Sequence, residues 1–140
     1  MKECPPGFSL FARVSPFTAL IGPLYTKGEG AKRVIGLRAE RKHCNTRGIV
    51  HGGVLATLAD TSLGYTIAFM HDPPRSLVTA SLTIDYAGSA NEGDWLESHV
   101  DVQKAGSRLV FANCYIVAVG ERIARASAVF AVPGDRKAKA

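Results

Sequence analysis

The chain has 140 residues, of which 46% are hydrophobic and 21% are charged, so it is long enough for one domain with a substantial core and too short for two. Its net charge is +5, but the lysines and arginines are scattered and form no basic run with interleaved aromatic residues, which argues against a nucleic-acid partner. No segment approaches the ~20 apolar residues of a membrane span, and prolines interrupt the N-terminus where a secretory signal needs an apolar run, so we expect a cytoplasmic protein.

Residues 1–30 form an N-terminal arm that contains four prolines and a short apolar stretch, SPFTALIG. Ser15 is a good N-cap residue and Pro16 suits the first position of a helix, so one or two helical turns are expected there. Residues 32–39 (KRVIGLRA) predict a short strand. We assign the main domain to residues 31–133 and expect the basic tail, residues 134–140, to be disordered.

A long helix is predicted from His51 to about Met70, because apolar residues recur there at steps of three and four. Small residues fill the gaps between them, so nearly the whole helix surface can be buried. Pro73 and Pro74 prevent the helix from continuing. This helix opens with two glycines and carries Asp60 in its interior, and a folding argument alone explains neither feature.

The sequence after the helix has the pattern of strands. In residues 76–86 apolar side chains alternate with polar ones, which places Thr79 and Ser81 together on the polar face. Further strands are predicted at residues 95–103, 108–119 and 122–132, with turns at 88–94, 105–107 and Gly120–Glu121. These four strands would form three consecutive antiparallel hairpins.

This order of elements predicts an α+β fold, a single antiparallel sheet wrapped around one long central helix. One helix covers only one face of such a sheet. The opposite face would carry Phe111 and Val117 beside polar groups, so we expect that face to pack against another subunit.

The segment NTRGIVHGGVLATLAD, residues 45–60, resembles the signature of the hot-dog thioesterases related to the phenylacetate-pathway enzyme (PaaI-like thioesterases). The later segments TASLTIDYAGSANEGD and QKAGSRLVFANCYI also resemble strands of that family, so the resemblance covers roughly residues 30–133. It implies a hot-dog fold and hydrolysis of acyl-CoA thioesters, and we expect no cofactor.

The residues at the start of the helix agree with this implication. A helix N-terminus exposes unpaired N–H groups and the positive end of a dipole, and Gly52 and Gly53 leave those groups uncovered by any Cβ atom. The Gly52 N–H is therefore a candidate oxyanion hole for a thioester carbonyl. The alternative is that both glycines only allow tight packing against a strand.

Asp60 is the candidate general base or nucleophile. Its helical neighbours at three and four residues include no cation, so its carboxylate is available to accept a proton from water. The alternative is a structural hydrogen bond to a neighbouring subunit.

The resemblance gives Asn45 a role in placing the thioester carbonyl or the attacking water, and gives the Thr79 hydroxyl a role in orienting that water. His51 lies just before the helix, where its ring can hydrogen-bond to the backbone or take part in acid–base catalysis. We favour the backbone role.

Contacts to coenzyme A are also implied by the resemblance. One strand end would line the pantetheine channel, and one turn would meet the nucleotide, where Lys104 and Arg108 suit phosphate groups by charge. The full set of substrate and CoA candidates is Gly53, Ser81, Tyr86, Ala87, Gly88, Ser89, Asn91, Lys104, Gly106, Ser107 and Arg108. For the turn residues the alternative is a solvated hairpin.

Competing chemistries have less support. There is no G-x-S-x-G motif, and Ser62 has no histidine in register. Cys44 lies near His51, but a small apolar cysteine is the commoner explanation. The three cysteines include no C-x-x-C pair, and no histidine has the spacing of a known ligand set, so no metal site is expected.

Two other functions could use the same residues: a non-catalytic acyl-CoA-binding hot-dog module, and a hot-dog dehydratase or hydratase in which His51 and Asp60 form a pair. The sequence leaves the acyl group open among aryl, short-chain and medium-chain substrates.

Gly52 and Asp60 lie eight residues apart. That separation is about 12 Å along a helix axis, so one helix cannot easily bring both groups to one thioester. We therefore expect a homodimer with two shared sites, and the resemblance implies that such dimers pair into a homotetramer.

Overall fold

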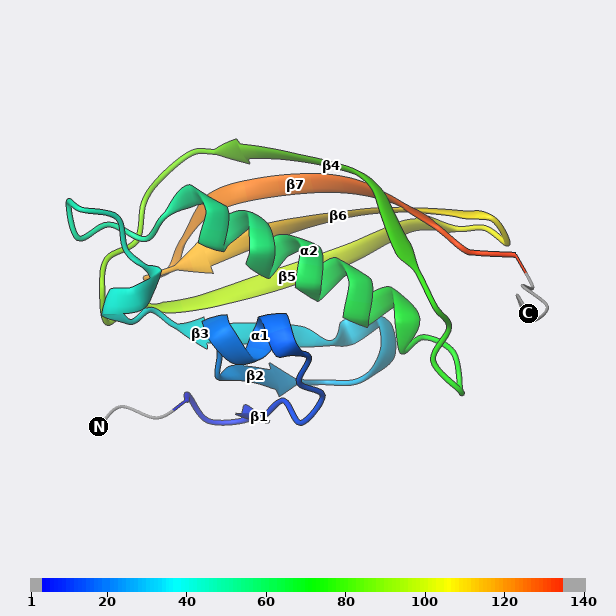
Figure 1. Ribbon diagram of the computed structural model, residues 1–140, viewed down its shortest axis with the longest axis horizontal. Coiled ribbons are helices and arrows are strands. Elements are labelled where there is room, and N and C mark those ends of the chain that lie inside the picture. The colour runs from blue at the N-terminus through cyan, green and yellow to red at the C-terminus, as the bar shows by residue number, and fades with distance from the viewer. Residues whose placement is uncertain (1–3, 135–140) are drawn as a thin grey trace.

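The computed structural model describes residues 4–134 as a seven-stranded antiparallel sheet with a long helix, α2, across one face (Figure 1). The predicted α+β architecture is confirmed. The elements in chain order are β1 (Ser9–Leu10), α1 (Pro16–Ile21), β2 (Leu24–Lys27), the 3-10 turn η1 (Gly30–Lys32), β3 (Val34–Arg38), the 3-10 turn η2 (Arg41–His43), α2 (Gly52–Ala68), β4 (Val78–Tyr86), β5 (Trp95–Ala105), β6 (Leu109–Ala118) and β7 (Glu121–Ala131).

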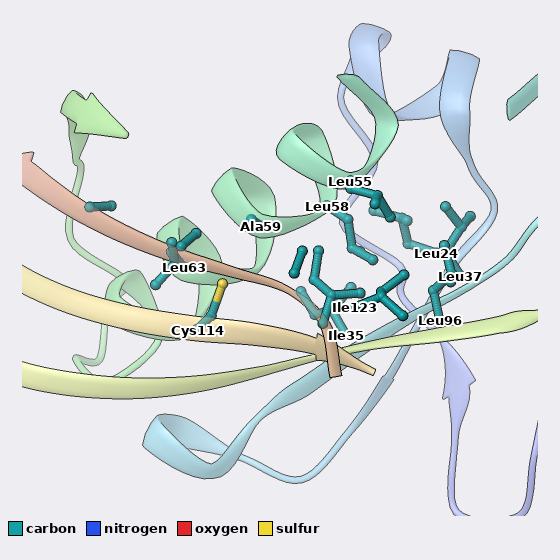
Figure 2. Close-up of a cluster of buried hydrophobic side chains, with 14 of the residues drawn as sticks. Leu24, Ile35, Leu37, Leu55, Leu58, Ala59, Leu63, Leu96, Cys114 and Ile123 are labelled. Carbon is teal, nitrogen blue, oxygen red and sulfur yellow. The ribbon is translucent and has the colours of Figure 1, made fainter. Parts of the chain in front are cut away.

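Helix α2 begins where the sequence predicts, with His51 as its N-cap, and ends at Ala68, just short of the predicted end at Met70. Its buried leucines and isoleucine pack onto the concave face of the sheet, as Figure 2 shows for Leu58 and Leu63 above Ile35 and Cys114. Burying one such leucine contributes about 1.5–3 kcal/mol. The hydrophobic core therefore fixes the position of the helix, and with it the position of Asp60.

The strand order is β1-β2-β3-β5-β6-β7-β4, which corrects the prediction of three consecutive hairpins. Strand β4 pairs with β7, from Val78 opposite Ala131 to Tyr86 opposite Ala124, and β5 lies between β3 and β6. Residues 87–94 are thus a crossover and not a hairpin turn. Local turn residues carry no information about such a long-range pairing, which explains the error.

Strand β4 forms one edge of the sheet and contains an irregularity that the sequence pattern hides. Thr79 is opposite Phe130 and Ser81 is opposite Val129, so the register shifts at Ala80. This β-bulge turns Thr79 toward the helix, on the same side as the buried Phe130. The prediction that Thr79 and Ser81 share a face is therefore wrong.

The hairpin between β6 and β7 turns at Val119 and Gly120, one residue earlier than predicted. Both residues have positive φ, 50° and 76°, as a type I′ turn requires, and Ala118 pairs with Glu121. A glycine at the second turn position accommodates this conformation, whereas Val119 adopts it at a steric cost.

The N-terminal arm contains the short helix that Ser15 and Pro16 predict, with a capping box between Ser15 and Thr18. The arm also supplies β1 and β2, which the sequence did not predict and which extend the sheet beyond β3. Of the predicted basic tail, residues 135–140 lie outside the described residues.

The face of the sheet away from α2 is largely polar, with Phe111 exposed at 40% of its surface and Val117 partly buried. On this face Arg122 lies 3.8 Å from the centroid of the Tyr115 ring, and the Tyr115 ring stacks on His99. The packing of a second subunit on this face remains a prediction.

Candidate functional site

The N-terminal end of α2 holds four of the predicted site residues together. The Nδ1 atom of His51 accepts a hydrogen bond of 2.8 Å from the Gly53 N–H, so the ring caps the helix. The Tyr86 hydroxyl donates a hydrogen bond of 2.8 Å to the Gly52 carbonyl. A Cβ atom on Gly52 would lie 3.2 Å from the Tyr86 ring, a tight contact that the ring would have to relieve by a small shift. We call this group the glycine end.

Of the backbone N–H groups in this first turn, some donate hydrogen bonds within the chain and one does not. His51 Nδ1 binds the Gly53 N–H, and the His51 carbonyl accepts from Val54 and Leu55. Among the hydrogen bonds of the described residues, the Gly52 N–H has no acceptor. It is therefore the amide of the first turn that is free for a ligand oxygen.

A second group, which we call the aspartate end, lies two turns further along α2. The Thr79 hydroxyl donates a hydrogen bond of 2.7 Å to Oδ1 of Asp60. Within the described part of the chain Oδ2 has no hydrogen-bond partner, and no cation pairs with this carboxylate. The bulge in β4 makes this contact, because without it the Thr79 side chain would point away from the helix.

A pocket of about 460 Å³ opens beside Asp60 and Thr79. Its walls are built by α2, by residues 74–79 and by the N-terminal arm. Aromatic side chains from these elements and from β7 line it: Phe17, Tyr65, Phe69 and Phe130. We call it the Asp60 pocket. A cavity that combines aromatic walls with several polar side chains, one of them a carboxylate, is a candidate small-molecule site.

Asn45 lies in the loop before α2 and folds that loop. Its side-chain Oδ1 accepts hydrogen bonds from the backbone of Arg47, at 2.8 Å, and of Ile49, at 3.2 Å. A bridge between Ile49 and Asn91 brings the predicted pantetheine segment to this loop. Asn45 therefore belongs structurally with the glycine end, and its side-chain amide N–H₂ donors have no acceptor among the described residues.

The remaining predicted residues divide between the two ends. On the glycine side lie Tyr86, the last residue of β4, and the residues that follow it: Ala87, Gly88, Ser89 and Asn91. The amides of Ala87 and Gly88 both donate to the Ile123 carbonyl. The turn with Lys104, Gly106, Ser107 and Arg108 lies on the other side, where the Gly106 carbonyl accepts from Arg75 Nη1 at 3.4 Å. Ser81 is exposed on the face away from α2 and reaches neither end. Within one chain, therefore, neither the glycine end nor the aspartate end contains all of the predicted catalytic and CoA-binding residues.

Sequence reasoning missed most of the Asp60 pocket. Gly64 and Ala68 follow Asp60 at steps of four, so helical periodicity could have placed them on the same wall. Arg13 and Arg75 also line the pocket, and they come from a loop in the arm and from the segment before β4. No local pattern marks those two arginines, because tertiary packing brings them there.

The other chemistries considered from the sequence find no support in residues 4–134. No group of three metal-ligating side chains occurs there, and Cys44 only approaches the Glu40 carbonyl, at 3.5 Å. His51 is bonded to the backbone and has no carboxylate partner in this part of the chain. No helix among these residues has the length and apolar character of a membrane span.

Comparison with known proteins gives a consistent result. The model of the thioesterase superfamily matches residues 47–125, which include α2 and the strands β4 to β6. The Pseudomonas aeruginosa protein named "Putative esterase PA0474" is 42% identical over 134 residues, which cover 95% of this chain and all of that protein. That alignment includes most of the N-terminal arm.

Solved structures share the fold. The E. coli PaaI protein, from the phenylacetic acid degradation operon, superposes with a TM-score of 0.77 over 86% of each chain at 20% identity. The Streptococcus mutans protein smu.793, solved with acetyl-CoA bound, has a TM-score of 0.72 at 23% identity and covers 80% of this chain and 90% of that one. The hot-dog fold predicted from the resemblance is thereby confirmed.

Proposed function

The chain belongs to the thioesterase superfamily, and we propose that within it this protein is a PaaI-like acyl-CoA thioesterase that releases a carboxylic acid and free CoA. The observation that carries the proposal is the pairing of Thr79 with Asp60 at the wall of a pocket that is partly lined by aromatic side chains. Such a carboxylate can be held in place by one oxygen while the other accepts a proton.

In the proposed reaction a water molecule attacks the thioester carbon while its proton passes to Oδ2 of Asp60. The charge that develops on the carbonyl oxygen is stabilised by the Gly52 N–H at the helix N-terminus. The tetrahedral intermediate then collapses, the C–S bond breaks, and the CoA thiolate takes up the proton. Direct attack by Asp60, with an anhydride intermediate, is the second route open to the same carboxylate.

The glycine end and the aspartate end are too far apart for one chain to complete this reaction, since Gly52 and Asp60 are separated by about 12 Å along the helix. We therefore propose a homodimer in which each site combines the glycine end of one chain with the aspartate end of the other. The predicted CoA contacts support the same division, because within one chain residues 86–91 lie beside the glycine end and residues 104–108 lie on the side of the aspartate end.

Strand β4 supports a route to this dimer. It is a nine-residue edge strand whose outer N–H and C=O groups are unpaired within the described chain. Thr79, near its start, contacts the aspartate end, and Tyr86, its last residue, contacts the glycine end. Antiparallel pairing of two β4 strands about a two-fold axis brings Thr79 of each chain toward Tyr86 of the other. Pairing of two dimers into a tetramer is part of the proposal only by family resemblance.

The test is a thiol-release assay with purified protein across aryl, short-chain and medium-chain acyl-CoAs. The wild-type protein should release CoA from at least one of them, and Asp60→Asn should lower kcat by about 10²–10⁴ while acyl-CoA binding persists. The matched control is Asp85→Asn, an exposed aspartate that pairs with Arg125 on β7. Binding without turnover on the whole panel would contradict the proposal and identify a binding module.

A further inference from the structure

The Asp60 pocket contains two cationic side chains that the proposed hydrolysis does not use. Arg13 and Arg75 both line it, opposite a single carboxylate, Asp60, which is already bonded to Thr79. The remaining lining combines aromatic and aliphatic side chains with the hydroxyl groups of serines and threonines. Two guanidinium groups and one carboxylate leave a net positive charge in this cavity, which suits an anionic ligand.

Arg75 has an unusually incomplete set of partners. Its Nε and Nη2 atoms are buried and have no hydrogen-bond acceptor among the described residues, and Nη1 has only the long contact of 3.4 Å to the Gly106 carbonyl. Nε and Nη2 form the edge of the guanidinium that donates two parallel hydrogen bonds to a carboxylate. Leaving such donors buried and unpaired is costly, so this edge needs an oxygen acceptor, and a carboxylate matches its two parallel donors best.

Arg13 reaches the same pocket from the arm. Its guanidinium lies 5.3 Å from the centroid of the Phe69 ring, and no acidic residue in the described chain forms a salt bridge with it. The Arg13 side chain is exposed, and its contact with the ring does not neutralise its charge. The two arginines therefore bring positive charge to one cavity from two different segments of the chain.

We propose that the preferred acyl group ends in a carboxylate, which Arg75 and Arg13 bind while the thioester lies at Asp60. This inference rests on the proposed thioesterase function. Arg75 also contacts Gly106, in the turn predicted to meet the nucleotide, so the CoA phosphates are the competing anion. We favour the acyl carboxylate because both arginines share one pocket of about 460 Å³ with Asp60, where the thioester would lie, and the experiment separates the two anions. The aromatic walls suit the apolar carbons between the two ends of such an acyl group.

The experiment compares glutaryl-CoA with pentanoyl-CoA, which have the same number of acyl carbons and differ in the terminal carboxylate. Wild-type protein should show kcat/KM about tenfold or more higher for glutaryl-CoA, because the unpaired donors reject an acyl chain without an acceptor. Arg75→Met should lower kcat/KM for glutaryl-CoA by about tenfold or more and leave that for pentanoyl-CoA within about threefold. Arg13→Met should act in the same direction with a smaller effect.

Arg33→Met is the matched control. The Arg33 guanidinium also lies over the Phe69 ring, 5.0 Å from its centroid, but Arg33 lines a different hollow beside β5 and not the Asp60 pocket. It should leave the preference between the two acyl groups unchanged. A loss of preference in Arg33→Met equal to that in Arg75→Met would assign the effect to general charge and overturn the proposal.

Two further outcomes would also overturn it: equal kcat/KM for both substrates in the wild type, or an equal loss on both in Arg75→Met, which would place that arginine on the CoA portion or in the fold. Dissociation constants for non-hydrolysable thioether analogues of the two acyl-CoAs give a readout that needs no turnover. Tighter binding of the carboxylated analogue, lost in Arg75→Met, supports the inference even if no hydrolysis occurs, and absence of hydrolysis alone contradicts the proposed function.

Discussion

The Thr79 hydroxyl and the Asp60 carboxylate lie 2.7 Å apart, which joins the edge strand β4 to the middle of α2. Nineteen residues separate them in the chain, and only the bulge at Ala80 turns Thr79 toward the helix. Thr79 thus holds the carboxylate directly, a closer role than the orientation of water that the resemblance implies.

Thr79→Val should therefore reduce kcat by about 10–100-fold, the value of one hydrogen bond to a charged group. Thr79→Ser keeps the hydroxyl and should stay within a few-fold of the wild type. Steady-state hydrolysis of the best acyl-CoA measures both. The loss in Thr79→Val should remain smaller than that in Asp60→Asn, and a larger loss would make Thr79 the primary catalytic residue.

His51 should behave as a helix cap. His51→Ala removes the acceptor for the Gly53 N–H and should cost about 1 kcal/mol in the free energy of unfolding, while His51→Asn retains a capping acceptor and should cost only a few tenths. Urea titrations of both variants, with kcat measured alongside, test this. Two stable variants with equally large losses in kcat would instead indicate acid–base catalysis by the ring.

A shared site predicts complementation between two inactive proteins. Asn45→Ala affects the glycine end and Asp60→Asn affects the aspartate end, so each homodimer should be nearly inactive. A mixed dimer contains one site with both substitutions and one with neither, and random refolding should restore about a quarter of wild-type activity. Refolding of each variant alone is the control. A mixture that stays inactive although heterodimers are demonstrated would place each complete site within one chain.

Gly36→Ala should destabilise the fold. Gly36 lies beneath the indole of Trp95, and a Cβ atom there would overlap the ring. Phe8 and Tyr25 pack around that ring with centroid distances of 5.0 and 5.6 Å, so it has little room to move. Overpacking of this kind costs about 1–3 kcal/mol. Urea unfolding should show this loss.

Gly64→Ala is the comparison for that substitution. Its Cβ would meet the Phe130 ring at 3.6 Å, an ordinary contact, and alanine favours a helix interior by up to about 1 kcal/mol. A gain in stability in Gly64→Ala beside a loss in Gly36→Ala is expected. Equal effects of the two alanines would mean that Trp95 moves freely.

Cys114 should make stability depend on pH in the alkaline range. Burial raises the pKa of its thiol to about 11, and the nearby Ser98 hydroxyl opposes part of that rise. In the unfolded chain the thiol ionises near pH ~8.5, so between there and 11 the native state binds more protons than the unfolded state and stability falls as pH rises. Below that range this contribution is constant.

The measurement is the free energy of unfolding at pH 8 and pH 10 for the wild type and Cys114→Ala. The substituted protein should lose less stability between the two pH values, whatever its starting stability. Parallel declines in the two proteins would show that the Cys114 thiol does not contribute.

Local sequence signals were sufficient for the helices. The apolar spacing and the prolines predicted α2 almost to its ends, and Ser15 with Pro16 predicted α1. The strand partners were not predictable in the same way, because the pairing of β4 with β7 depends on contacts distant in sequence. Alternation in residues 76–86 even concealed the bulge, since one extra residue reverses the face of everything before it.

The residues of the candidate site also fall into those that local sequence marks and those that only tertiary packing brings together. Gly52, Gly53 and Asp60 were recognisable because glycine and a carboxylate are costly in a buried helix. Arg13 and Arg75 carry no such cost in their own segments, where a charged residue is ordinary. Their significance arises only when packing places them beside Asp60, and a sequence pattern does not record that.

A ribosome releases β4 before any of the strands that complete its side of the sheet, and β7, its partner within the chain, emerges last of all. The nascent chain must therefore hold α2, with part of its leucine face uncovered, until β7 has been made. Loss of β7 by early termination would leave β4 unpaired and that helix face open to chaperones or aggregation. The contact between Thr79 and Asp60 can consequently become stable only after β7 has been synthesised.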